Sequence, residues 1–236
     1  MTQTPHHARL RRVWGASRRV THFEFELTNG SGFEFHSGQF ISLRFEQGSK
    51  RYARPYSIAT ASGADSRFEL CTSATSGDEA SAWLQGLDVG DSIEFTGPYG
   101  FFRLRHPLGR VLAFIATGTG IAPIRAMLQE LDRKHTPRET WLIFGVREES
   151  DILYQNEFEN LNRRNPDFHF IPTLSRPGPN WEGHRGYVQE QIKRYLAGKK
   201  DLQAYICGKP EMVEEVRRLL QSLGYAAPAI SYERLE

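Results

Sequence analysis

The chain changes its pattern of apolar and polar positions near its middle. Up to about Phe102, short segments alternate between apolar and polar residues, and glycine-rich turns separate them. Such alternation is typical of strands with one buried face. The expected strands are Thr21–Leu27, Phe40–Phe45, Tyr52–Thr60, Arg67–Thr72 and Ser92–Phe95. Together they predict an antiparallel β-barrel.

After Pro107, apolar runs alternate with segments of helical period. Strands are expected at 111–116, 140–145, 168–173, 203–207 and 229–232, and helices at 123–133, 152–161, 187–196 and 210–222. This order predicts an α/β domain whose five-stranded parallel sheet is covered on both faces. The predicted domains are 1–106 and 107–236, divided just after the turn Gly97-Pro98-Tyr99-Gly100.

Composition agrees with a soluble two-domain enzyme, because 236 residues with 39% hydrophobic content can bury substantial cores. No apolar run is long enough to span a bilayer, and the basic N-terminus lacks the apolar segment of a signal peptide. We therefore expect a cytoplasmic protein without a membrane partner. The formal net charge of +2, without a recognition motif, argues against nucleic acid.

The cysteine and histidine content argues against a metal site. Cys71 and Cys207 are the only cysteines, which excludes a disulfide scaffold and a four-cysteine iron–sulfur cluster within the chain. His6-His7 is expected in a mobile start and His184 in a loop, without ligand spacing. An iron–sulfur partner would be a separate protein.

Arg54-Pro55-Tyr56-Ser57 places a guanidinium, a phenol and a hydroxyl within four residues of a predicted strand. Arg54 and Tyr56 would share one face, and Ser57 would point the other way. Arg offers a fork of donors to pyrophosphate oxygens, and Tyr offers a ring for stacking, which suits a flavin nucleotide. The alternative is a half-buried strand whose arginine is a solvated charge.

A second flavin-compatible segment contains Gly77 and Ser81. Gly77 gives backbone freedom, and Ser81 can cap or begin a short helix whose free amides attract a phosphate. An ordinary helix cap is the alternative.

The run Thr117-Gly118-Thr119-Gly120 follows the apolar strand 111–116 and leads into a helix expected to start at Pro123. The amides and dipole of that helix can receive a pyrophosphate. Pro123 stands where the usual dinucleotide fingerprint has its third glycine, and Arg147, not an acid, follows the next strand. A generic strand-to-helix turn is the alternative.

Cys207-Gly208-Lys209-Pro210 lies where another predicted strand ends and a helix begins. Ligands bind at this edge of open parallel sheets, and Gly208 permits close backbone approach. Met212, in the first turn of the helix, is assigned to the same site. A buried cysteine that only fills the core is the alternative.

Taken together, these motifs and Glu233 resemble the ferredoxin-NADP reductase family, over nearly the whole chain from Leu10 onward. The resemblance implies that Arg54, Pro55, Tyr56, Ser57, Gly77 and Ser81 bind FAD, with Asp78 replacing a second glycine of many relatives. It implies that Thr117, Gly118, Thr119, Gly120 and Pro123 lie against the nicotinamide nucleotide, and Cys207, Gly208, Lys209 and Met212 near its ring. The implied catalytic residues are Ser57, Cys207 and Glu233.

The C-terminus departs from the family pattern. Many relatives end in an aromatic residue that stacks on the flavin, whereas this chain ends Tyr232-Glu233-Arg234-Leu235-Glu236. Leu235 can cover the flavin loosely, and Tyr232 can instead be a strand residue in the core.

The resemblance implies hydride transfer between NADPH and FAD, and electron exchange with ferredoxin or flavodoxin, by a monomer. NADPH is favoured over NADH because Arg147 follows one strand of the second domain, Ser175 and Arg176 follow the next, and Arg185 lies close behind in a loop rich in proline and glycine. Together they can clamp a 2′-phosphate, although Glu148 and Glu149 adjoin Arg147. The alternatives are an oxygenase reductase, a reductase of free flavin, and an electron-transfer subunit without nicotinamide turnover. Clustered basic residues of the flavin half can steer an acidic carrier: Arg9, Arg11, Arg12, Arg18, Arg19, Lys50, Arg51 and the arginines between 103 and 110.

Overall fold

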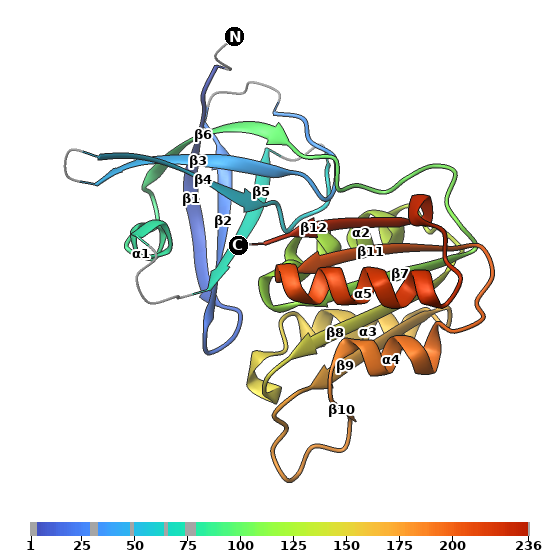
Figure 1. Cartoon of the computed structure of the whole chain (residues 1–236). Coiled ribbons are helices and arrows are strands. Elements are labelled where there is room, and N and C mark those ends of the chain that lie inside the picture. Colours follow the sequence, from blue (N-terminus) through green and yellow to red (C-terminus); the bar gives the residue numbers. More distant parts are fainter. Residues whose placement is uncertain (1–3, 29–32, 48–49, 64–65, 74–78, 236) are drawn as a thin grey trace.

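The computed structural model describes residues 4–28, 33–47, 50–63, 66–73 and 79–235. It contains two sheets, one in each of two adjoining lobes (Figure 1). The first sheet is antiparallel, with the strand order β4-β3-β6-β1-β2-β5. Its strands are β1 (His6–Gly15), β2 (Val20–Leu27), β3 (Phe40–Gln47), β4 (Lys50–Ser57), β5 (Arg67–Ser73) and β6 (Ser92–Tyr99). Helix α1 (Glu79–Gln85) lies between β5 and β6.

Strand β1 is missing from the sequence-based expectation, which also placed His6 and His7 in a mobile start. Both histidines begin β1, opposite Phe95 and Glu94 of β6. Five charged or histidine side chains within ten residues conceal the strand pattern, yet Ala8 and Leu10 alternate inward and are fully buried. Aromatic side chains of the other strands complete this core, with Phe23, Phe25, Phe68 and Phe95 almost fully buried.

The second sheet is parallel, in the order β10-β9-β8-β7-β11-β12. Its strands are β7 (Val111–Thr117), β8 (Glu139–Val146), β9 (Phe168–Leu174), β10 (His184–Arg185), β11 (Leu202–Gly208) and β12 (Ile230–Arg234). The two-residue edge strand β10 makes six strands where five were expected, because so short a pairing leaves no periodic pattern in the sequence. Helices α2 (Ile121–Arg133) and α3 (Gln155–Arg164) pack on one face, and α4 (Val188–Tyr195) and α5 (Pro210–Ser222) on the other.

Helix α2 begins two residues before the expected start at Pro123. The segment Gly118–Gly120 forms a 3-10 turn, and α2 follows at Ile121. Pro123 is therefore the third helical residue, which is compatible with its missing amide because the first four amides of a helix have no partner within it. In contrast, Pro210 stands at the first position of α5, as expected.

The two lobes share an apolar core. Ala59, Cys71 and Phe102 belong to the same buried cluster as Phe114 of β7 and Met127 of α2. The end of β12 points at the barrel, so the C-terminus lies between the lobes (Figure 1). Among the described residues, no helix is long and apolar enough to cross a membrane. Nor does that part of the chain hold a group of three His, Cys, Asp or Glu side chains suited to a metal ion.

Candidate active site between the two sheets

The site forms where β4 of the barrel meets β12 of the parallel sheet. The Ser57 hydroxyl lies 3.5 Å from Oε1 of Glu233 and can donate to it, although the two residues are 176 positions apart. A Cβ placed on Gly100, directly after β6, would lie 3.8 Å from Oε2 of the same carboxyl. The Gln39 amide donates to the Gly100 carbonyl at 3.1 Å. Ser57 and Gly100 of the barrel therefore lie beside one carboxyl group of the second lobe, and Gln39 holds the Gly100 backbone.

Glu233 has an unusual protonation equilibrium. Burial disfavours its carboxylate and raises its pKa to about 7, although the contact with Ser57 opposes the shift. A carboxyl group with this pKa can hold or release a proton near neutral pH.

Cys207 lies next to Glu233 in the sheet. Its position on β11 is opposite Ala116 of β7 and Glu233 of β12. The side chain is fully buried, and this burial, with smaller contributions from Glu233 and Cys71, raises the pKa of the thiol well above its ordinary value. Cys207 is therefore a neutral thiol at physiological pH, suited to packing against a ring and not to nucleophilic attack.

Close backbone contact joins the 3-10 turn to β11. A Cβ on Gly120 would lie 2.3 Å from the Cys207 carbonyl oxygen, and one on Gly208 would lie 2.3 Å from Oγ1 of Thr117. Gly208 also has φ of +153°, and Met212 of α5 would be 2.6 Å from its Cβ. Gly120 therefore requires glycine because the backbone of β11 lies too close for a side chain, and Gly208 because of its positive φ.

The same turn presents groups that fit a nucleotide. Thr117 Oγ1 is buried and has no hydrogen-bond partner among the described residues. Gly118, with φ of +55°, faces open space where a Cβ would meet nothing within 4 Å. Lys209 is exposed at the cap of α5. An orphaned hydroxyl, an open turn and a nearby cation fit the pyrophosphate and ring of a nicotinamide nucleotide.

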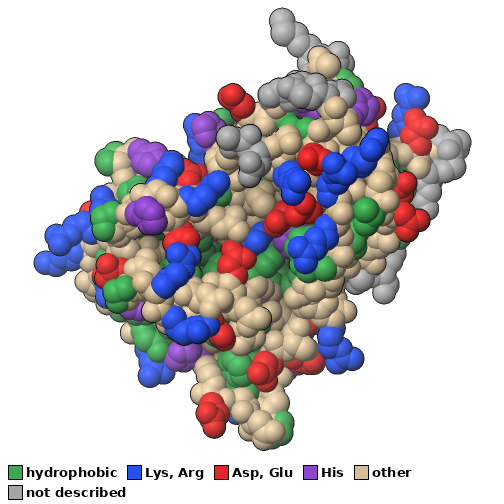
Figure 2. Space-filling model, turned by 180° about the vertical axis from the view of Figure 1, so that it is seen from behind, with side chains coloured by type: hydrophobic (Ala, Val, Ile, Leu, Met, Phe, Trp, Pro, Cys, Tyr) green, Lys and Arg blue, Asp and Glu red, His purple; other side chains and the backbone are tan. Residues whose placement is uncertain are grey.

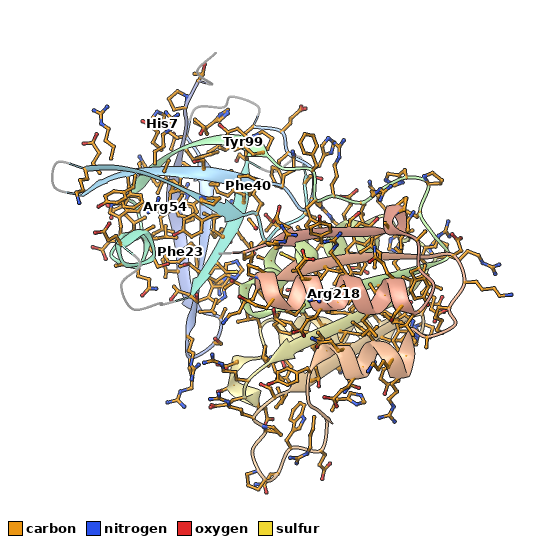
Figure 3. The ribbon with its side chains drawn as sticks, viewed as in Figure 1. His7, Phe23, Phe40, Arg54, Tyr99 and Arg218 are labelled. Atoms are coloured by element: carbon orange, nitrogen blue, oxygen red, sulfur yellow. The ribbon has the colours of Figure 1, made fainter. Side chains whose placement is uncertain are left out.

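Arg54 and Tyr56 lie on β4, opposite Leu43 and Ile41 of β3. Arg54 is exposed, donates to the Ala53 carbonyl at 3.2 Å and stands 5.7 Å from the ring of Tyr52 (Figure 3). Alternation along β4 puts the rings of Tyr52 and Tyr56 and the guanidinium of Arg54 on one side of the strand, and Ser57 is the last residue of that strand. Pro55 is exposed on the other side. This surface fits a flavin nucleotide, with the phosphates at Arg54 and the ring near Ser57.

The second flavin-compatible segment is only partly described. Gly77 lies outside the described residues. Ser81 lies inside α1, two residues after its first residue, and does not begin the helix. Its buried hydroxyl lies 2.8 Å from that of Thr72, so the contact ties α1 to β5.

The arginines expected to select the coenzyme share one edge of the parallel sheet. The Arg176 amide donates to the Arg147 carbonyl at 2.8 Å, and the Ser175 amide to the Val146 carbonyl at 3.0 Å. Arg185 of β10 pairs with Leu174, the residue before Ser175. All three arginine side chains are exposed, and that of Arg185 donates to the Trp181 carbonyl at 2.8 Å.

The structure tests one of the two expectations drawn from the sequence for the C-terminal residues. Tyr232 is on a strand but is 39% exposed, not in the core, and Arg217 stacks over its ring at 4.1 Å. Leu235 is partly buried against the shared core, and its amide donates to the Gly208 carbonyl at 2.9 Å. The last described residue is thus held beside the Cys207-Gly208 turn.

A charged cluster between the lobes was not anticipated from the sequence. Arg125 of α2 is 9% exposed and contacts Glu69 of β5 and Glu157 of α3. Its position among the apolar residues Ile124, Met127 and Leu128 was the available signal, since an arginine inside an apolar helix stretch requires buried partners.

Comparison with known families divides the chain in the same order as the structure. Residues 7–104 match the oxidoreductase FAD-binding domain, and residues 114–218 match the oxidoreductase NAD-binding domain.

Among individual proteins, the chain is 36% identical to ferredoxin--NADP reductase B of Sorangium cellulosum, and the match covers 98% of both chains. It is 31% identical to the electron transfer component of the xylene/toluene monooxygenase of Pseudomonas putida, over 92% of this chain and 63% of that protein.

Two solved structures have the same architecture. A ferredoxin NADP+ reductase from Neisseria gonorrhoeae with bound FAD and NADP superposes with a TM-score of 0.86 at 25% identity, covering 99% of both chains. An Amycolatopsis cytochrome P450 reductase superposes with a TM-score of 0.88 at 27% identity, covering 98% of this chain and 69% of that one. The predicted fold class, a barrel followed by an α/β domain, is confirmed.

Proposed function

The chain belongs to the ferredoxin-NADP reductase family, an FAD- and nicotinamide-dependent class of oxidoreductases, and we propose that it transfers hydride between NADPH and FAD and electrons between FAD and a small carrier protein. The observation that carries the proposal is the convergence of Ser57, Glu233 and Cys207 at the junction of the two sheets. It brings a flavin-compatible strand and a nucleotide-compatible turn to one place.

The two bound cofactors would supply the redox chemistry, and the protein would supply alignment. Arg54 would hold the FAD phosphates. Thr117 and Gly208 would let the nicotinamide ring approach closely, with Cys207 behind it. Glu233, with its raised pKa, would hold a proton at its carboxyl group beside Ser57, so that a proton is available near the reacting rings.

We infer NADPH as the coenzyme. Three exposed guanidiniums at the ends of β8, β9 and β10 match a dianionic 2′-phosphate, which arginine binds bidentately. Glu148 and Glu149 are also exposed near Arg147 and would favour ribose hydroxyls, so the preference depends on Arg176 and Arg185.

Substitution tests that inference. Arg176→Ala should raise the Michaelis constant for NADPH by about ten- to a hundredfold, corresponding to about 1.5 to 3 kcal/mol from one charged hydrogen bond, and leave NADH almost unaffected. Arg218→Ala, on the exposed side of α5 (Figure 3), is the matched control and should change neither constant. An equal response to both coenzymes, or a wild-type preference for NADH, would reject the 2′-phosphate site.

The electron acceptor is proposed as ferredoxin or flavodoxin. The ferredoxin reductase relative is matched over 98% of its length, whereas the monooxygenase component is matched over 63% of its length. A role as an oxygenase reductase is the second candidate, and that match favours it. We propose that the protein acts as a monomer in the cytoplasm.

Purification, an absorbance spectrum and steady-state oxidation of NADPH and NADH with ferricyanide test the proposed function. We expect a yellow protein with one FAD that survives gel filtration and preferential oxidation of NADPH. Loss of FAD on the column would favour a reductase of free flavin. Bound FAD without oxidation of either coenzyme would favour an electron-transfer subunit.

A further inference from the structure

A row of polar side chains on α2 binds the segment that follows β4. Arg125, Gln129 and Arg133 are spaced four residues apart and therefore share one face of the helix. Arg125 donates to the Ala59 carbonyl at 3.0 Å, Gln129 accepts from the Ala61 amide at 3.0 Å, and Arg133 donates to the Ser62 carbonyl.

Arg125 is the buried end of this row and has the most contacts. Its guanidinium bonds Glu69 of β5 and, at 2.7 Å, Oε2 of Glu157 on α3. It also lies 4.5 Å from the centre of the Tyr154 ring. Behind Glu69, the buried His22 of β2 places Nε2 2.9 Å from the same carboxylate oxygen. One side chain thus joins β5, α2, α3 and the loop after β4.

Both ends of the bond between Arg125 and Ala59 lie a few residues along the chain from a cofactor-compatible element, which is β4 for Ala59 and the 3-10 turn for Arg125. Ala59 follows Ser57 by two residues, and Arg125 follows Gly120 by five residues, about 7.5 Å of helix. The path from the proposed flavin strand to the nucleotide turn therefore crosses from one lobe to the other at the bond between Arg125 and Ala59.

Relying on the proposed function, we propose that Arg125 is a positioning residue that sets the alignment of the nicotinamide ring against the flavin without touching either. Small displacements of reacting groups are costly, since about 1 Å can slow a reaction about a hundredfold. Arginine suits the position because its planar fork reaches three separate acceptors, whereas an ammonium is a point charge.

The buried ion network of Arg125, Glu69 and Glu157 is expected to contribute little to the free energy of unfolding, so its charges can be removed together. Replacing a complete buried ion network by neutral groups is often close to neutral for stability, whereas removing one member leaves an unpaired charge. Arg125→Met alone leaves Glu69 and Glu157 unpaired and can fail to fold. The triple substitution Arg125→Met, Glu69→Gln, Glu157→Gln removes the charges together, so it keeps the proposal testable.

The first measurement uses the protein as purified, without added coenzyme. In the triple variant, amide hydrogen exchange should become faster in residues 58–62 and 118–126 and remain unchanged in the barrel core. Arg218→Met is the control, since Arg218 is exposed on α5 and donates to the Glu214 carbonyl of its own helix, and it should exchange like wild type. Unchanged exchange in both segments of the triple variant would overturn the coupling.

The second measurement uses the FAD-loaded protein. The triple variant should reduce flavin at saturating NADPH about tenfold or more slowly, with a weaker long-wavelength charge-transfer band. FAD content and NADPH affinity of the triple variant should stay within about twofold of wild type. The single variant Arg125→Lys, which keeps both glutamates, should reduce flavin faster than the triple variant but more slowly than wild type. A wild-type rate, or a rate loss matched by lost NADPH affinity, would overturn the proposal. If wild type itself does not oxidise NADPH, the proposed function fails, and hydrogen exchange alone decides whether Arg125 couples the lobes.

Discussion

The exposed guanidinium of Arg54 allows a sharp test at the scale of single residues. If it binds the FAD phosphates, Arg54→Ala should weaken FAD binding by about 2 kcal/mol, the scale of one charge-assisted hydrogen bond. Titration of the apoprotein with FAD, followed by flavin fluorescence, measures this loss. Arg51→Ala on the same strand is the control, because the Arg51 side chain is 88% exposed and pairs with Glu46. Equal affinity in Arg54→Ala and wild type would show that the phosphates lie elsewhere.

Glu233 gives a prediction about pH. Its pKa of about 7 in the folded protein lies above its ordinary value of 4.5, so folding favours the protonated form. The stability from this group is complete below the ordinary pKa and is lost as pH rises through the folded value. Glu233→Gln, which stays neutral, should therefore gain stability over wild type between about pH 5 and 8, by about 1 to 3 kcal/mol.

Urea unfolding of the apoprotein at several pH values measures that difference. The rate of flavin reduction by NADPH should also change around pH 7 in wild type and lose this inflection in Glu233→Gln. A stability difference that is the same at all pH values would mean that Glu233 titrates normally.

At the scale of elements, apolar periodicity predicted the parallel strands and most of the barrel strands to within a few residues. It failed where that signal is weak. Strand β1 carries so many charged side chains that only Ala8 and Leu10 report it, and β10 is two residues long. The start of α2 was placed late because the 3-10 turn Gly118–Gly120 continues into the helix and moves its first residue to Ile121.

The candidate site could be predicted in part for the same physical reason. Ser57, Cys207 and Glu233 lie within one residue of the ends of strands that the fold brings together, and motifs at strand ends are visible in the sequence. The Arg125 cluster depends on which faces of β5, α2 and α3 meet across the lobes. No local pattern records such a pairing, so Glu69 and Glu157 look like ordinary surface charges, although Arg125 itself stands out inside an apolar stretch of α2.

Contact between the 3-10 turn and β11 gives a prediction at this scale. Gly120→Ala would place a methyl group 2.3 Å from the Cys207 carbonyl, a backbone atom that cannot move without shifting the strand. We expect a loss of about 1 to 3 kcal/mol of stability, as in overpacked cores, and a much weaker NADPH affinity. Thermal unfolding and coenzyme titration measure the two effects.

Gly118→Ala separates strain from steric contact. Gly118 has φ of +55° but open surroundings, so an alanine there should cost about 1 kcal/mol of backbone strain without displacing β11. Gly120→Ala should therefore weaken NADPH binding more than Gly118→Ala does. Equal losses of affinity would mean that the close packing of Gly120 on Cys207 does not determine the shape of the turn.

At the scale of the whole molecule, charge is balanced overall but not fully paired. The net charge is +2, and acidic and basic side chains are interspersed over the rear face (Figure 2). Some basic residues of the flavin half are neutralised locally, since Arg11 pairs with Glu26 and Arg51 with Glu46. Arg103, exposed three residues after Gly100, remains close to the proposed site in sequence. If an acidic carrier docks beside the site, Arg103 is the arginine to test.

Salt dependence tests whether this charge guides the carrier. Added salt shortens the Debye length, which is about 10 Å at 0.1 M, so reduction of an acidic ferredoxin should slow as salt rises. Reduction of a neutral quinone by the same protein should hardly change. Arg103→Glu should slow ferredoxin reduction at low salt and flatten its salt dependence, whereas Arg218→Glu, on α5 of the other lobe, should behave like wild type. If ferredoxin and quinone respond to salt alike, long-range attraction does not guide the carrier, and short-range contacts at the flavin edge must select it.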